Sequence, residues 1–129
     1  MKTLILLSML LSPSGYAAQS SKTNCDSEKN YPEISKTELK TLAEQKAATI
    51  FDVNSDESFK EAHVPGAIHY GTVKGNFAKQ LPQDKSAIIV AYCGGPSCGA
   101  WKKAASEACK LGYTNVKHFK GGISGWKKN

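Results

Sequence analysis

The sequence predicts an α/β domain with a mostly parallel central sheet of about four to five strands, flanked by helices. Two observations lead to this class. Short runs of β-forming apolar residues alternate with segments of helical periodicity, an order typical of parallel strands joined by helices. In addition, the run AIIVAY (87–92) is apolar almost throughout, as expected for a central strand covered on both faces.

The first 18 residues have the three-part pattern of a secretory signal peptide. Met1 and Lys2 supply a positive start, TLILLSMLLS an apolar core, and PSGYAA a breaker followed by small residues. The apolar core is too short to span a membrane. We therefore expect cleavage after Ala18 or Ala17 and export, to the bacterial periplasm, with no membrane insertion of the cleaved chain.

The rest of the chain is predicted to hold one domain. Residues 19–31 form a polar lead-in rich in Ser, Asn and Lys, and residues 32–129 are long enough for a single core. The domain begins with a capping box, Ser35 with Glu38, and a helix of about ten residues. Further elements follow in the order strand 48–53, helix 55–62, strand 67–70, weak helix 77–81, strand 87–92, helix 99–111, strand 116–119, and a turn with a helical fragment over 121–128.

The charge pattern argues against nucleic-acid and phosphate chemistry. The chain has 17 basic and 11 acidic residues, and every basic residue is a lysine. Bidentate clamps on phosphate groups are built from arginine, and these lysines are scattered among acidic residues. We therefore expect a solvated basic surface and no nucleic-acid partner.

The segment YCGGPSCGAW (92–101) carries the candidate chemistry, and three interpretations compete for it. A zinc site needs closely spaced ligand pairs, whereas this spacing is C-x4-C and the three histidines are scattered. We therefore expect no metal, and nothing suggests another cofactor. A Cys93–Cys98 disulfide would close a short loop and stabilise little. The third interpretation is a nucleophile held in an anion cradle.

Cys93 stands where parallel sheets place their ligand sites, beyond the C-terminal end of the central strand. Amides of the glycine-rich turn and the positive end of the following helix would hold an anion there and lower the thiol pKa. Lys102 and Lys103 would steer an anion toward the site. The predicted cradle consists of Gly94, Gly95, Pro96, Ser97, Cys98 and Gly99, with the glycines turning their amides inward.

Four motifs in order resemble a rhodanese-like sulfurtransferase domain, over about residues 32–127. They are Phe51-Asp52-Val53, His63-Val64-Pro65-Gly66-Ala67-Ile68, the strand entering Cys93, and Gly121-Gly122-Ile123 through Trp126. The resemblance implies that Cys93 accepts sulfane sulfur from a polysulfide, thiosulfate or persulfide donor and passes it, as a persulfide, to a thiol or other nucleophile.

The sequence departs from the family pattern in two places. The six-residue loop often ends in a basic residue, and here Cys98 occupies that position. Arginine usually follows Asp-Val, and here Asn54 does. Without arginine, neither a clamp on thiosulfate nor the related phosphatase chemistry is expected. Cys98 is either a resolving thiol that attacks a Cys93 persulfide or a small loop residue.

Residues around the site have structural interpretations. We expect Asp52 to fix local backbone and His63 to make a hydrogen bond before the Pro-Gly turn. Cys109 is interpreted as a buried, inert thiol, and the state of Cys25 stays open. Two other function classes remain, a dithiol redox protein using Cys93 and Cys98 and a non-catalytic binding module; the sequence does not determine the oligomeric state.

Overall fold

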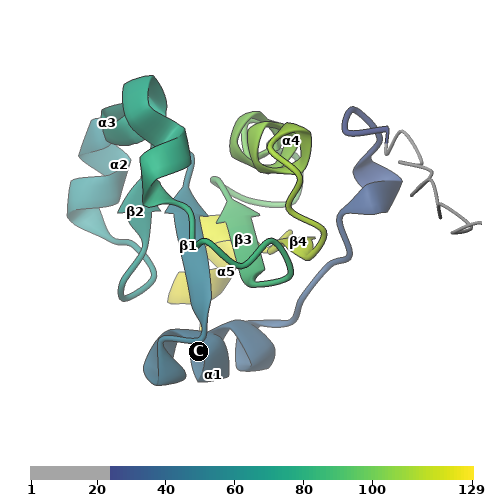
Figure 1. Cartoon of the computed structure of the whole chain (residues 1–129). Coiled ribbons are helices and arrows are strands. Elements are labelled where there is room, and N and C mark those ends of the chain that lie inside the picture. The colour runs from purple at the N-terminus through teal and green to yellow at the C-terminus, as the bar shows by residue number, and fades with distance from the viewer. Residues whose placement is uncertain (1–23) are drawn as a thin grey trace, which may run out of the picture.

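The computed structural model describes residues 24–129, so the predicted signal peptide lies outside the described residues. Four strands form one parallel sheet in the order β2-β1-β3-β4 (Figure 1). They are β1 (Ala48–Asp52), β2 (Ile68–His69), β3 (Ile88–Tyr92) and β4 (Val116–His118). The helices that flank the sheet complete the predicted α/β fold class, which is confirmed.

The helices begin where the sequence offers caps. The Ser35 hydroxyl accepts a hydrogen bond from the Glu38 amide (3.1 Å), and Ser55 does the same for Ser58 (3.2 Å). Within residues 24–129, no helix has the length and apolar character needed to cross a membrane. The α-helices are α1 (Lys36–Gln45), α2 (Asp56–Glu61), α3 (Tyr70–Val73), α4 (Lys102–Lys110) and α5 (Gly122–Lys127), and the 3-10 helices are η1 (Glu28–Asn30) and η2 (Lys74–Gln80).

Several element boundaries differ from the sequence prediction, and the weak helix predicted over 77–81 is replaced by α3 and η2, which together span 70–80. The strand predicted over 67–70 has only two residues, because Tyr70 already begins α3. The helix predicted over 99–111 starts at Lys102, because successive turns occupy the residues before it. In these turns the Cys98 amide donates to the Gly95 carbonyl (3.1 Å), and the Lys102 amide to the Gly99 carbonyl (3.2 Å).

Alternation along β3 divides the core into two layers. Ile89, Ala91 and Cys93 belong to the cluster that includes the alanines of α4, whereas Val90 and Tyr92 belong to the cluster that includes residues of α1 and α5. All five side chains are buried, because β3 has helices on both faces. Cys93 therefore continues the α4-facing row of the central strand.

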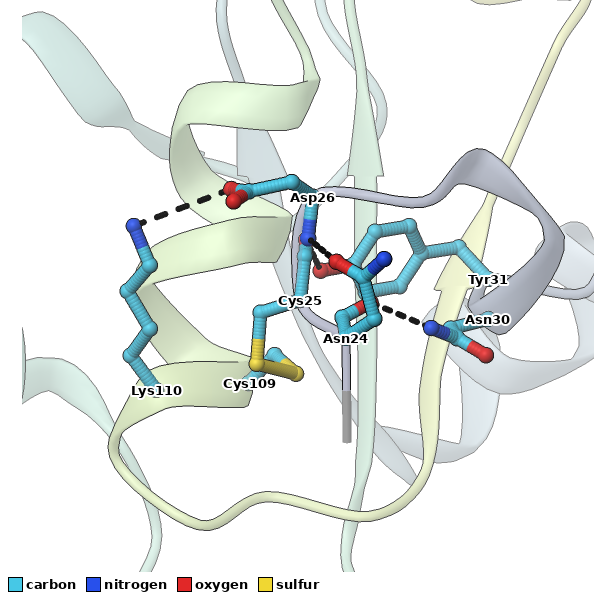
Figure 2. The surroundings of a disulfide bond; sticks show 7 residues. All are labelled: Asn24, Cys25, Asp26, Asn30, Tyr31, Cys109 and Lys110. Carbon is cyan, nitrogen blue, oxygen red and sulfur yellow. Dashed lines mark hydrogen bonds and ion pairs between the residues drawn. A yellow bond between two sulfur atoms is a disulfide. The ribbon is translucent and has the colours of Figure 1, made fainter. Parts of the chain in front are cut away.

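The polar lead-in packs against α4. A disulfide joins Cys25 to Cys109 with a Cα–Cα distance of 5.7 Å, and Asp26 lies 3.8 Å from the Lys110 ammonium (Figure 2). The hydroxyl of Tyr31 donates to the Cys25 carbonyl. The interpretation of Cys109 as a free, buried thiol is therefore wrong, because the periodicity of one helix does not reveal a distant segment that folds across it.

Candidate active site

Cys93 follows the last residue of β3, and its side chain is 2% exposed. Cys98 is half-buried, and a disulfide joins the two residues with a Cα–Cα distance of 6.3 Å. The structure thus joins the predicted nucleophile by a covalent bond to Cys98, for which the sequence left two roles open. Of the two residues, Cys98 is the more exposed.

The first turn of α5 packs against the loop and donates hydrogen bonds to it. The Ile123 amide donates to the Cys93 carbonyl (2.9 Å), and the Ser124 amide donates to the Gly94 carbonyl (3.0 Å). Gly122 approaches the loop so closely that a Cβ atom there would lie 2.6 Å from the Cys93 oxygen. Its φ of +59° also lies in the left-handed region that favours glycine. The loop is therefore held by a segment that begins at Gly122, 29 residues after Cys93.

The loop glycines have ordinary negative φ angles, and the positive φ angles lie at other glycines. The glycines with positive φ within residues 24–129 are Gly66, Gly112 and Gly122, so Gly94, Gly95 and Gly99 lie outside the left-handed region. The predicted inward orientation of their amides does not require such angles. The conformational demand falls on Gly122, because its Cβ position is already occupied by the loop backbone.

Several loop amides are available to an anion. Among the amides of residues 94–99, only that of Cys98 donates to a backbone carbonyl in the part of the chain that the structure describes. Pro96 has no amide hydrogen, and Pro96 and Ser97 are exposed. The amides of Gly94, Gly95, Ser97 and Gly99 are therefore the candidate donors of the cradle.

The two predicted steering lysines have different surroundings. The Lys102 ammonium lies 2.6 Å from Glu28 of the lead-in and lowers the pKa of that carboxyl, chiefly through their hydrogen bond. The Lys102 side chain passes beside the loop, since a Cβ atom at Gly99 would lie 3.7 Å from its Cε. Lys103 is exposed on the same helix.

Asp52 is fully buried and joins three segments at the carboxyl edge of the sheet. Its Oδ2 accepts a hydrogen bond from the Tyr92 hydroxyl (2.5 Å), which in turn accepts one from the Val64 amide (3.0 Å). Its Oδ1 accepts one from the Asn54 amide (2.9 Å). Burial, with the hydrogen bond to Asp52, raises the pKa of Tyr92, so this hydroxyl stays protonated. Asp52 thereby fixes the backbone at Asn54 and the side chain of Tyr92.

The histidines separate into surface and site positions. His63 is exposed, with its Nδ1 2.7 Å from the Phe59 carbonyl and its ring stacked on Phe59. His69, which sequence reasoning missed, places Nε2 2.8 Å from the Asn54 carbonyl and Nδ1 2.9 Å from the Thr72 hydroxyl. Since a carbonyl only accepts, Nε2 carries the proton. The position of His69 near the end of the strand predicted over 67–70 was the available signal.

Asn54 also lies at this edge. Its side-chain Nδ2 is buried and has no hydrogen-bond partner within residues 24–129. Its Oδ1 lies 3.7 Å from the place a Cβ atom would take at Gly94. The carboxamide is therefore next to the residue that follows Cys93.

Comparison with known proteins agrees with this geometry. Residues 35–129 match the model of the rhodanese-like domain family. A thiosulfate sulfurtransferase GlpE of Coxiella burnetii is 26% identical over 98 residues, which cover 75% of this chain and 88% of that protein. The BH2092 protein of Bacillus halodurans is 30% identical, with a TM-score of 0.58 over 77% of this chain and 73% of that one. The human single-domain sulfurtransferase TSTD1 shares the fold, with 24% identity and a TM-score of 0.59 over 76% and 98% of the two chains. The sequence resemblance is confirmed, and the chain belongs to the rhodanese-like domain family.

Proposed function

We propose that this protein is a sulfurtransferase in which Cys93, once reduced, carries sulfane sulfur as a persulfide. The observation that carries the proposal is the position of Cys93 at the end of the central strand, at the entrance to a loop with free amides. Membership of the rhodanese-like family and relatives named as sulfurtransferases support the same chemistry.

The proposed cycle has two half-reactions. The Cys93 thiolate attacks the terminal sulfur of a donor; the bond between that sulfur and the donor breaks, and the donor leaves with the bonding electron pair. In the second half, an acceptor thiolate attacks the outer sulfur of the Cys93 persulfide, and Cys93 leaves as a thiolate. Loop amides stabilise the negative charge on the sulfur in both halves.

Cys98 offers a second route by which the persulfide is consumed. Its thiolate attacks the inner sulfur on Cys93 and expels hydrosulfide, which leaves the Cys93–Cys98 disulfide. Two electrons from an external thiol reductant then reopen the disulfide. Cys98 is the sulfur that such a reductant reaches first, because Cys93 is 2% exposed and Cys98 is half-buried.

The disulfide also favours a second candidate function, a dithiol redox protein. That activity needs both sulfurs for each turnover, whereas persulfide formation needs only Cys93. Single substitutions therefore separate the two functions.

The test compares reduced wild-type protein with Cys93→Ser and Cys98→Ser after exposure to polysulfide or thiosulfate. Mass spectrometry of the tryptic peptide 86–102, which contains both cysteines, reports the added sulfur. We expect no persulfide in Cys93→Ser and a longer-lived persulfide in Cys98→Ser. Polysulfide should be the better donor, because the chain has no arginine to hold the two charges of thiosulfate. Equal loss of persulfide in both variants would favour the redox function.

We further propose that the protein works in an oxidising compartment after export. The predicted signal peptide and the two disulfides support this location, since disulfides persist mainly outside the reducing cytosol. N-terminal sequencing of protein from its native cells tests it, with a start at Ala18 or Gln19 as the expected result.

A further inference from the structure

Asn54 has a buried donor without an acceptor. Within residues 24–129, its Nδ2 is the buried side-chain nitrogen or oxygen atom that has no hydrogen-bond partner. Leaving a buried donor unpaired is unfavourable, and native proteins rarely do so. Such a donor suggests an acceptor that is present in another state of the site.

The backbone around Asn54 is fixed from three directions. The Asn54 amide donates to Asp52 (2.9 Å), its carbonyl accepts from His69 Nε2 (2.8 Å), and the preceding Val53 amide donates to the Tyr92 carbonyl (2.8 Å). The last bond ties the residue before Asn54 to the residue before Cys93. The carboxamide is therefore held at the same edge of the sheet as the cysteine, with its Oδ1 3.7 Å from the place that a Cβ atom would take at Gly94.

In the oxidised state, the Cys93 sulfur does not serve as the acceptor that Asn54 Nδ2 lacks. In the disulfide, the Cys93 sulfur is neutral and a weak acceptor. Reduction makes it a thiol whose ionised form is an anion, and sulfur loading extends it by one atom that also carries charge. Hydrogen bonds from an amide N–H to an anion are stronger than those to a neutral group.

We propose that Asn54 is an anion-binding residue of this site, which donates its Nδ2–H to the sulfur anion on Cys93 after the disulfide opens. The thiolate is the first such anion, and the outer sulfur of the persulfide is the second. The persulfide half of this proposal rests on the proposed function, whereas the thiolate half does not. Asn54 thus supplies one hydrogen bond to the anion in a chain that has no arginine.

The experiment uses the Cys98→Ser protein, in which Cys93 is the free thiol because Cys25 and Cys109 are paired. Iodoacetamide alkylation across pH reports the thiolate pKa of Cys93. Asn54→Leu keeps the size of the side chain and removes the donor, and we expect about tenfold less thiolate at neutral pH. Asn54→Ala should have the same effect. Asn115→Ala, which removes a carboxamide just before β4 at the opposite edge of the sheet, is the control and should titrate like the parent.

An unchanged alkylation profile in Asn54→Leu and Asn54→Ala would overturn the proposal. Thermal unfolding of each variant identifies any that fails to fold, and the folded one of the pair decides. Adding polysulfide to the Cys98→Ser parent keeps the two proposals apart. If the parent gains no sulfur while Asn54→Leu shifts the titration, the sulfurtransferase function fails and the thiolate donor stands.

Discussion

His118 ends β4 with its imidazole stacked on Trp101, at a centroid distance of 3.6 Å and an interplanar angle of 11°. Its side chain is 7% exposed. Burial lowers the pKa of His118 from 6.5 to about 4, against the opposing charges of Glu33 and Glu28. The neutral ring is therefore the form that the folded protein selects.

This selection makes the folded state pH-dependent. Between the unfolded and folded pKa values the unfolded chain binds more protons, so the free energy of unfolding falls as pH drops from about 6.5 toward 4. The loss attributable to His118 should be on the order of 1–2 kcal/mol. Urea unfolding at pH 7 and pH 4.5 measures it, with His118→Phe as the variant that keeps a stacked ring but cannot bind a proton. If the variant loses as much stability as the wild type, the dependence comes from other groups.

Helix α5 is short, yet it determines the shape of the loop that contains Cys93. The amides of Ile123 and Ser124 donate to the carbonyls of Cys93 and Gly94. The first residue of the helix, Gly122, lies so close to the loop backbone that no larger residue fits there. The helix therefore acts as a support for the loop, and its glycine is the point of closest approach.

Substituting Gly122 should damage the loop and the site together. In Gly122→Ala, the new methyl group meets loop backbone at 2.6 Å and the residue has a strained φ. We expect the free energy of unfolding to fall by roughly 2–4 kcal/mol, and the rate of persulfide formation by about tenfold or more.

Gly125→Ala in the same helix is the matched control, because its Cβ would lie 3.9 Å from the Phe119 ring, an ordinary contact. Chemical denaturation and persulfide mass measurements on the two variants make the comparison. Equal behaviour of the variants would contradict the supporting role of Gly122.

The two disulfides constrain the molecule over very different chain lengths. Cys25 and Cys109 are 84 residues apart, and their bond joins the lead-in to α4 (Figure 2). Cys93 and Cys98 are only 5 residues apart. In the chain-entropy account, the longer loop restricts the unfolded chain much more.

Removing the long-range bond should therefore cost more stability. We expect the Cys25→Ser, Cys109→Ser double variant to lose about 2–4 kcal/mol of unfolding free energy. The Cys93→Ser, Cys98→Ser double variant should lose less, since it opens a short loop. Urea unfolding of both proteins without added reductant provides the measurement, and the reverse order would show that the lead-in contributes little to the fold.

The α/β class, the strand that leads to Cys93 and the apolar face of α4 were predictable from local patterns in the sequence. These features were predictable because β alternation and helical spacing are properties of consecutive residues. Ser35 marked the start of α1 for the same reason, since a cap acts within one turn. The motifs that carry the family resemblance also lie in short, ordered segments.

The bonding partners of particular atoms could not be predicted in this way, because they depend on tertiary packing. The Cys25–Cys109 bond, the support of Cys93 by Ile123 and the unpaired nitrogen of Asn54 each depend on segments that are distant in the chain. The close approach of Gly122 to the loop backbone likewise depends on packing between distant segments. Periodicity indicates which face of a helix or strand is buried, but long-range packing determines which atoms come into contact there. The chemistry of this site depends on those contacts.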